Sequence, residues 1–275
     1  MPLTIQTNVS SLNAQLNLAK SQVTLATSFN RLSSGYRINS AKDDAAGLAI
    51  SESMKTQIRS YSVAERNAND GVSMAQTAEG ALGEVSNVLG RLRELATQGA
   101  TGSLQSTDRN FLQTEFKSLQ SEIKRILTST KFNGVALLKS AVTSVKFQVG
   151  INNTSTDRIT GSFGAITLAS VTATTLSLGG SATNAQGALD KIDTALTTVS
   201  TARARFGALM NRLDITTSNI QTARLNTTAA NSRIRDVDVA EETATLSRSQ
   251  VLATAGVSVL AQANSSPQLA LGLLR

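Results

Sequence analysis

Apolar and small side chains recur in alternating steps of three and four residues near both ends of the 275-residue chain. The N-terminal stripe consists of Val9, Leu12, Leu16, Ala19, Val23, Ala26 and Asn30. The C-terminal stripe consists of Val239, Thr243, Leu246, Gln250, Ala253, Val257, Leu260 and Asn264. Because this spacing is typical of coiled-coil seams, we predict a helix with a buried seam at each end of the chain.

The same spacing returns near Asp43 and continues from Ile50 to Ala96, which predicts one helix about 80 Å long. Two glycines interrupt the pattern between Gln98 and Ser106, and a shorter antiparallel helix follows. Its apolar positions are Leu112, Phe116, Leu119, Ile123 and Ile126. A third long stripe, which we expect to close an antiparallel bundle, contains Ile192, Leu196, Val199, Phe206, Met210, Leu213 and Ile220.

Turn signals between the helical stripes predict a small β-hairpin region. The segment TKFNGVALL contains Asn133 and Gly134, and VKFQVGINNTSTDRIT alternates around a polar turn at Asn152 and Asn153. The wider region 140–186 is rich in Ser and Thr, which indicates an exposed, irregular insert. A solvated loop and an O-glycosylated loop are both compatible with this composition.

The expected fold is therefore mainly α: a long antiparallel helical bundle or coiled-coil rod, with a small β-hairpin region and a short irregular central insert. The N-terminal helix and the turn after it occupy 1–42, and the C-terminal helix occupies 236–275. The two halves of the helical rod occupy 43–139 and 187–235. The β-hairpin and the variable surface region occupy 140–186.

Composition supports close-packed helices and gives no sign of catalysis. Aromatic residues make up 3% of the chain, and Trp, Cys and His are absent, which removes disulfides, thiol chemistry and imidazole bases. The adjacent carboxylates Asp43 and Asp44, and likewise Glu241 and Glu242, point about 100° apart on a helix and do not converge on one atom. We interpret them as helix N-terminal charges, and we expect no catalytic, cofactor or metal site.

The net charge of +7 comes from dispersed basic residues without an aromatic stacking platform, so we expect no nucleic-acid partner. No apolar run approaches the length of a membrane span, and none before Lys20 resembles a cleaved Sec signal. Residues 1–42 carry only basic charges, whereas 236–266 are mainly acidic. This asymmetry favours pairing of the two ends with each other.

Four segments make the chain resemble bacterial flagellin. They are RLSSGYRINSAKDDAAGLAIS (31–51), ERNANDGVSMAQTAEGALGEV (65–85), TKFNGVALL (130–138) and SRSQVLATAGVSVLAQAN (247–264). The chain also ends in LALGLLR, similar to the Leu-Leu-Arg terminus of that family. The central region does not resemble the large outer domains of long flagellins.

The resemblance implies a structural subunit, not an enzyme, that polymerises into the helical flagellar filament used for motility. It further implies unfolded export by the flagellar type III apparatus to the cell exterior. The implied partners are other copies of the chain, an export chaperone on the C-terminal helix, the filament cap and hook–filament junction proteins. Residues 1 to about 42 and 236–275 correspond to the family's inner core, where we expect interfaces that form an open helical polymer.

The residues expected to pack the filament core are Val9, Leu12, Leu16, Val23, Leu246, Val257, Leu260, Leu273 and Leu274. Leu18, Leu25 and Leu32 lie outside the predicted seam, and we interpret them as a second face against neighbouring subunits. The segment RLRELATQG (91–99) also resembles the region that contacts the flagellin-sensing Toll-like receptor of vertebrates. The matching contact positions are Arg91, Leu95 and Glu115.

Two alternative functions remain open at this point. A hook–filament junction protein belongs to the same superfamily and shares the terminal helices. A secreted helical adhesin or binding module would use the central insert and would stay monomeric when concentrated or seeded.

Overall fold

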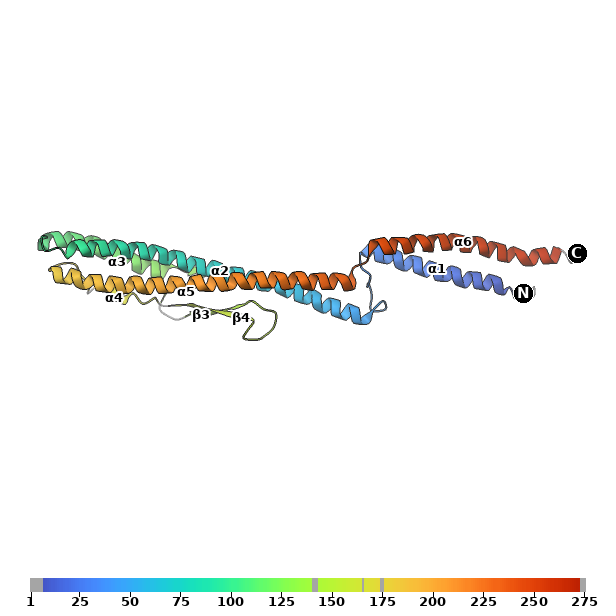
Figure 1. The fold of residues 1–275 in the computed structure, drawn as a ribbon, viewed down its shortest axis with the longest axis horizontal. Helices are drawn as coiled ribbons and strands as arrows, with labels where there is room; N and C mark the ends of the chain where they lie inside the picture. Colours follow the sequence, from blue (N-terminus) through green and yellow to red (C-terminus); the bar gives the residue numbers. More distant parts are fainter. Residues whose placement is uncertain (1–6, 140–142, 165, 174–175, 273–275) are drawn as a thin grey trace. The chain divides into compact units, whose positions relative to one another are not determined.

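The computed structural model describes residues 7–139, 143–164, 166–173 and 176–272. The described elements form a mainly helical fold, as predicted (Figure 1). The helices are α1 (Val9–Ser34), α2 (Ala45–Gly99), α3 (Ser106–Ser129), α4 (Ala169–Thr172), α5 (Ala182–Arg235) and α6 (Val239–Gly272). The strands are β1 (Lys131–Phe132), β2 (Val135–Ala136), β3 (Thr143–Gln148) and β4 (Arg158–Phe163).

The chain divides into two compact units. The terminal unit contains Met1–Thr56 and Asn226–Arg275, and the central unit contains Gln57–Leu225. Both divisions fall inside a long helix, α2 or α5, whereas the sequence placed the nearest boundaries at 42/43 and 235/236. The terminal unit therefore includes the first turns of α2 and the last turns of α5 besides the two terminal helices.

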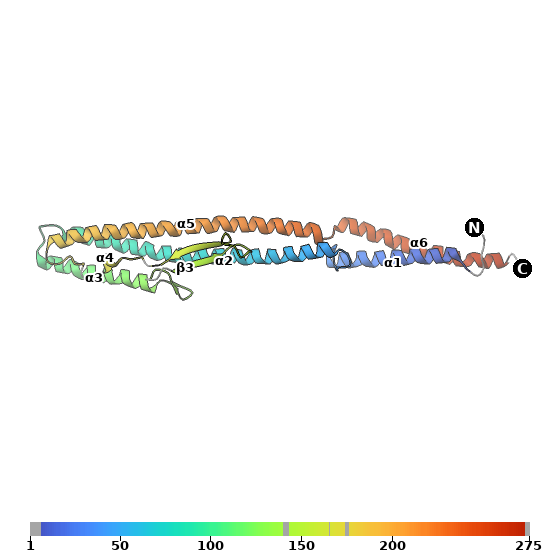
Figure 2. The ribbon, with the colours of Figure 1, turned by 90° about the horizontal axis from the view of Figure 1, so that it is seen from below.

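The central unit is built on α2, α3 and α5, which run alongside one another (Figure 2). Its core is lined mainly by small and branched aliphatic residues with a few phenylalanines, and fully buried examples include Leu82, Leu89, Phe116, Ile192 and Leu213. Ion pairs lie across the surface of this bundle, with Arg203 Nη2 2.6 Å from Glu79 Oε1 and Arg93 Nε 2.7 Å from Asp193 Oδ1. Such exposed pairs contribute little to stability, so burial of the aliphatic stripe holds the helices together.

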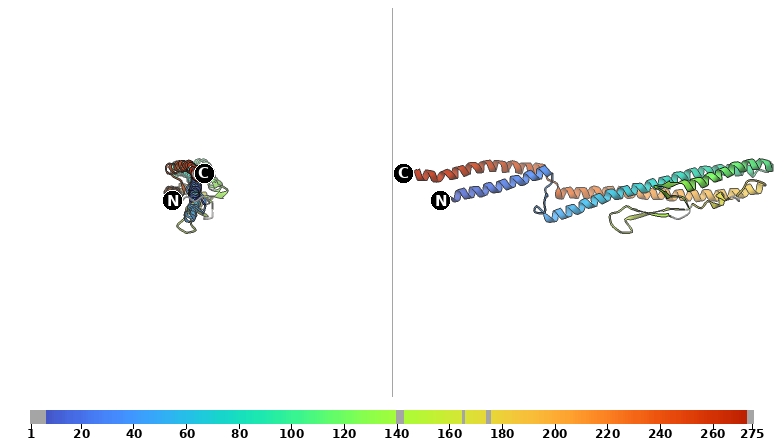
Figure 3. Two further views of the ribbon diagram at one scale, coloured as in Figure 1. Left: turned by 90° about the vertical axis from the view of Figure 1, so that its right-hand side faces the viewer. Right: turned by 180° about the vertical axis from the view of Figure 1, so that it is seen from behind.

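Two short antiparallel hairpins lie in the central unit. Strands β1 and β2 join through Asn133 and Gly134, whose φ angles of 46° and 81° belong to a type I′ turn. Strands β3 and β4 pair from Thr143 opposite Phe163 to Gln148 opposite Arg158. Figure 3 shows this second hairpin beside the helices from behind. The predicted β-hairpin region is thus confirmed as two separate hairpins.

The Ser- and Thr-rich insert is less exposed than its composition suggested. Within it, Leu168, Val171, Leu176 and Leu178 are buried in the core of the central unit. Gln120 on α3 also donates through Nε2 to the carbonyl oxygen of Val171 at 2.7 Å. The expectation of an entirely exposed, irregular segment is wrong, because spaced apolar side chains anchor it among polar neighbours.

Candidate assembly interface

Helices α1 and α6 form an antiparallel pair within the terminal unit (Figure 1). At the start of α1, Asn8 accepts a hydrogen bond from the Ser11 amide, and Gly35 ends the helix with a left-handed φ of 75°. At the start of α6, Asp238 Oδ1 accepts from the Ala240 amide at 2.9 Å. These end groups fix where the paired helices begin and end.

The seam between α1 and α6 combines leucines with small residues. On α1 the seam residues are Ser11, Ala14, Leu18, Ser21, Leu25, Ser28 and Leu32, all buried or half-buried. On α6 they are Glu242, Leu246, Ser249, Ala253, Gly256, Leu260 and Ala263, again buried or half-buried. Each line keeps the three-four spacing, and the small residues allow close approach of the two backbones.

The predicted N-terminal seam is therefore wrong. Val9, Leu12, Leu16 and Val23 are 50 to 67% exposed, whereas Leu18, Leu25 and Leu32, which were expected to face neighbouring subunits, lie in the seam with α6. Both stripes satisfy the same spacing, so periodicity alone does not say which one meets the partner helix. On α6, Leu246, Ala253 and Leu260 do lie in the seam, while Val239 and Val257 are exposed.

Polar contacts set the register of the two helices. At one end of the pair, Ser11 Oγ donates to Asn264 Oδ1 at 2.7 Å, and Asn8 Nδ2 donates to the Ala263 carbonyl at 2.8 Å. At the other end, Arg31 Nη1 lies 3.5 Å from Glu242 Oε2. The ion pair agrees with the predicted attraction between a basic and an acidic end. Because polar groups buried at a helix seam need partners, these contacts oppose axial sliding.

Large apolar side chains on the outer face of the helix pair are not covered by any other part of the chain that the structure describes. Besides the α1 stripe, α6 exposes Val251, Leu252, Val257 and Val259, each with more than half of its surface accessible. Two packed helices bury only one stripe each, so the opposite faces need further helices to leave water. We call these α1 and α6 side chains the outer apolar face. The predicted packing residues Leu273 and Leu274 lie outside the described residues.

The segment that follows α1 is held against the end of α5 inside the terminal unit. Tyr36 and Asp236 form a β-bridge, and the Arg37 amide donates to the Arg235 carbonyl at 2.6 Å. The Arg235 guanidinium lies 4.5 Å from the centre of the Tyr36 ring and 2.5 Å from Glu52 Oε1. These contacts tie the helix pair to the adjoining ends of α2 and α5.

Of the adjacent carboxylates, Asp44 caps α2 by accepting from the Gly47 amide at 2.8 Å, and Glu241 and Glu242 stand in the first turn of α6. Their interpretation as helix N-terminal charges is confirmed. Asp43 instead closes the preceding turn. Its Oδ2 accepts from the Ser40 amide and hydroxyl and from the Asn39 amide, and these bonds lower the pKa of the carboxyl group.

The three positions that resemble a receptor contact differ in accessibility. Arg91 and Glu115 are about half exposed, and Arg91 Nε donates to Glu115 Oε1 at 2.9 Å. Hydrogen bonds to Glu115 and Glu94 raise the pKa of the Arg91 guanidinium. Leu95, by contrast, is 1% exposed and belongs to the core of the central unit. Its expected role as a surface contact is not compatible with this structure.

Among the described residues, no group of three or more His, Cys, Asp or Glu side chains is placed so that it could hold a metal ion. Nor does any helix in the described part of the chain have the length and apolar character needed to cross a membrane.

Comparisons with known proteins identify the family. Residues 5–143 match the model of the bacterial flagellin N-terminal helical region, and residues 189–274 match that of the C-terminal helical region. The chain belongs to the bacterial flagellin family. It is 44% identical to a flagellin of Halalkalibacterium halodurans, over 98% of this chain and 99% of that protein.

Two further similarities agree with that assignment. The chain is 39% identical to the flagellar filament core protein flaB2 of Brachyspira hyodysenteriae, over 98% of this chain and 99% of that protein. It is also similar to the crystal structure of Bacillus cereus flagellin, with 33% identity and a TM-score of 0.51, over 60% of this chain and 94% of that one. This flagellin is a structural filament subunit for motility and not an enzyme.

Proposed function

We propose that the outer apolar face of α1 and α6 is the surface through which the chain polymerises. One observation carries this proposal: side chains such as Val23 and Val251, 67% and 68% exposed, stand on helices whose other stripe is already buried. Covering these residues with helices of neighbouring copies removes apolar surface from water. We propose that the part of this face on one copy packs against a different part on the next, a heterologous contact that builds an open helical polymer when its rotation does not close a ring.

The register contacts support the same proposal. Ser11 with Asn264 and Arg31 with Glu242 hold the two helices in one alignment, so the outer apolar face has a fixed arrangement in every copy. A preformed arrangement reduces the conformational entropy that assembly would otherwise lose. The polar contacts in the seam thereby hold the outer apolar face in the arrangement that packs against neighbouring copies.

A charge on the outer apolar face tests this proposal. Val23→Asp places a carboxylate where a neighbouring copy must pack, so seeded growth of filaments stops while the helix content is unchanged. Ile215→Asp is the matched control, since Ile215 is 63% exposed on α5 in the central unit. Electron microscopy and sedimentation of seeded, concentrated protein measure the outcome. Filaments of normal length and yield from Val23→Asp would disprove the role of this face.

Partners that handle the subunit before and during assembly are part of the same proposal. The uncovered valines and leucines of α6 favour association in the cell, so a flagellar export chaperone binds the C-terminal helix until type III export. Outside the cell, the filament cap and hook–filament junction proteins contact the terminal helices and the subunit enters an extracellular filament. Competition between a purified chaperone and seed growth tests the first step; unchanged growth at saturating chaperone would contradict it.

Recognition by the flagellin-sensing Toll-like receptor is a second candidate role. The exposed pair of Arg91 with Glu115 supports it, because charged side chains on a helix surface are available to a receptor. Leu95 would act only by holding α2 in place. A reporter-cell assay with monomer compares Arg91→Ala with Arg203→Ala, another surface arginine in an ion pair. Equal signalling by both variants, or silence of the unmodified monomer at saturating dose, would contradict this role.

A further inference from the structure

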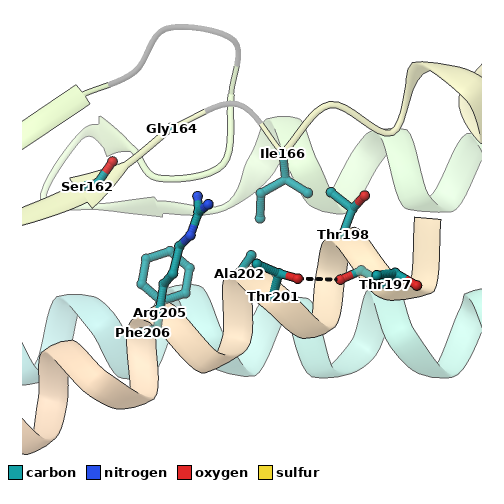
Figure 4. Close-up of a pocket in the computed structure, with 9 residues that line it drawn as sticks. All are labelled: Ser162, Gly164, Ile166, Thr197, Thr198, Thr201, Ala202, Arg205 and Phe206. Atoms are coloured by element: carbon teal, nitrogen blue, oxygen red, sulfur yellow. Dashed lines mark hydrogen bonds between the residues drawn. The ribbon is translucent and has the colours of Figure 1, made fainter. Parts of the chain in front are cut away.

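A pocket of about 310 Å³ lies between Ser162 of β4, Gly164, Ile166 and the middle of α5. Phe206 and Ala202 of α5 give it an apolar floor, and Thr197, Thr198 and Thr201 also line it. Each of these threonine hydroxyls donates to the carbonyl oxygen four residues earlier in α5. Figure 4 shows Arg205 extending from α5 toward the end of β4, while Ile166 points back toward α5. The pocket thus combines an apolar floor with one cationic wall.

The floor of the pocket continues an aromatic stack. Phe206 stacks on Phe163 with ring centres 5.4 Å apart, and Phe163 meets Phe147 edge to face at 6.3 Å. Phe206 is the end member of this stack and borders the pocket. A further ring placed there would gain both an aromatic partner and the guanidinium of Arg205, for which the described residues show no ion pair.

The chain itself exposes a ring that fits this pocket. Phe111 on α3 is 77% exposed, in a protein with only seven phenylalanines, two tyrosines and no tryptophan. Asp108 and Glu115 flank it, three residues before and four residues after, on the same side of the helix. Because Arg91 already pairs with Glu115, Asp108 is the acidic neighbour that the ring brings to the basic wall of the pocket, and the two surfaces are complementary in charge.

Phe111 cannot reach the pocket of its own chain. Next to it, Gln113 accepts a hydrogen bond from Ser177, only a few residues before α5 begins at Ala182. The pocket begins at Thr197, about four helical turns or roughly 22 Å further along α5. A Phe111 ring therefore reaches this pocket only from another molecule.

We propose that Phe111 of one subunit inserts into the Phe206 pocket of a neighbouring copy, as a second contact in addition to the outer apolar face. The inference rests on the proposed polymerisation. A ring on one element and a pocket on another make a heterologous contact, which builds an open polymer when the rotation between copies does not close a ring. The size is suitable, because a cavity of roughly 150 Å³ already holds benzene.

The absence of cysteine from the chain allows a direct test by crosslinking. The double variant Phe111→Cys with Thr201→Cys is polymerised and treated with a short bismaleimide reagent. We expect a ladder of dimers and higher species in filaments, and no ladder from unpolymerised chains or from either single variant. The control pair Phe111→Cys with Ile215→Cys gives no ladder, because Ile215 does not line the pocket.

A second measurement does not depend on cysteine. Phe111→Ala should raise the critical concentration for seeded growth about tenfold, because an anchoring ring is lost, whereas Ile215→Ala leaves it unchanged. Three results would overturn the Phe111 contact: filaments that give no crosslinked ladder, a ladder in unpolymerised chains, or an unchanged critical concentration for Phe111→Ala. Failure of the unmodified chain to polymerise would instead overturn the proposed function.

Discussion

Leu18 of α1 packs over Gly256 of α6: a Cβ atom added to Gly256 would lie 3.3 Å from Leu18 Cδ1. This contact shows how the terminal helices approach each other, with a leucine of one seated on a glycine of the other. The close approach also fixes which stripe of each helix faces inward. The other stripe is left for neighbouring molecules.

Enlarging Gly256 should separate the terminal helices. Gly256→Val adds an isopropyl group against Leu18, and we expect the helix pair to lose about 1–3 kcal/mol of stability through overpacking. Gly187→Val on α5 is the control, since no atom lies within 4 Å of a Cβ added there. Hydrogen exchange of the α1 and α6 amides measures the effect. Equal protection in both variants would contradict the seam.

The hydrogen bond between Ser11 and Asn264 makes a separate prediction. Asn264→Leu removes the partner of Ser11, whose side chain is buried and would keep an unsatisfied hydroxyl. We expect the helix pair to lose about 1–3 kcal/mol. The double variant Ser11→Ala with Asn264→Leu should recover most of this loss, which hydrogen exchange again reports. No recovery in the double variant would show that the two residues are not coupled.

Truncation of two phenylalanines on α3 should change the stability of the monomer by very different amounts. Phe116 is fully buried, so Phe116→Ala is expected to destabilise the central unit by about 3–5 kcal/mol. Phe111 is 77% exposed, and Phe111→Ala should change monomer stability by less than about 0.5 kcal/mol. Urea unfolding of the monomers measures both values. Comparable losses in the two variants would contradict the burial assignments on α3.

The Asp43 carboxyl group predicts an acid-sensitive turn. Hydrogen bonds from Ser40 and Asn39 lower its pKa, so the ionised form stabilises the folded turn. This contribution is complete at neutral pH and is lost as pH falls below the ordinary carboxyl value of 3.8 and through the lowered pKa. We expect the Asn39 and Ser40 amides to lose hydrogen-exchange protection in that range. In Asp43→Asn, the protection of the Asn39 and Ser40 amides should already be reduced at pH 7 and should not fall further at low pH. If the variant loses protection at low pH as the unmodified chain does, Asp43 is not the source of the acid sensitivity.

The long helices were predictable from the sequence because their apolar spacing persists over many turns and few residues interrupt it. The Asn133–Gly134 turn was predictable for a similar local reason, since both residues tolerate positive φ. What spacing alone did not reveal is the direction in which each terminal stripe faces. The heptad separation of Leu18, Leu25 and Leu32, with small residues between them, was the available signal for the true seam.

The remaining differences also have local physical causes. The resemblance placed Leu95 at a receptor-contact position along α2. Whether the Leu95 side chain is exposed or buried depends on the helices packed against α2, which only the structure shows. In the Ser- and Thr-rich insert, four separated apolar residues are enough to anchor the backbone, although the average composition is polar. The ring of Phe111 lies in an otherwise ordinary helical pattern, so its exposure could not be deduced from spacing.

A reconstruction of the filament at side-chain resolution tests the central claim most directly. The measured quantity is the exposed fraction of Val9, Leu12, Leu16 and Val23 on α1 and of Val251, Leu252, Val257 and Val259 on α6. We expect these side chains to be buried between copies, while Leu18 remains seated on Gly256 within each copy. A filament in which the outer apolar face remains in contact with solvent would contradict the account.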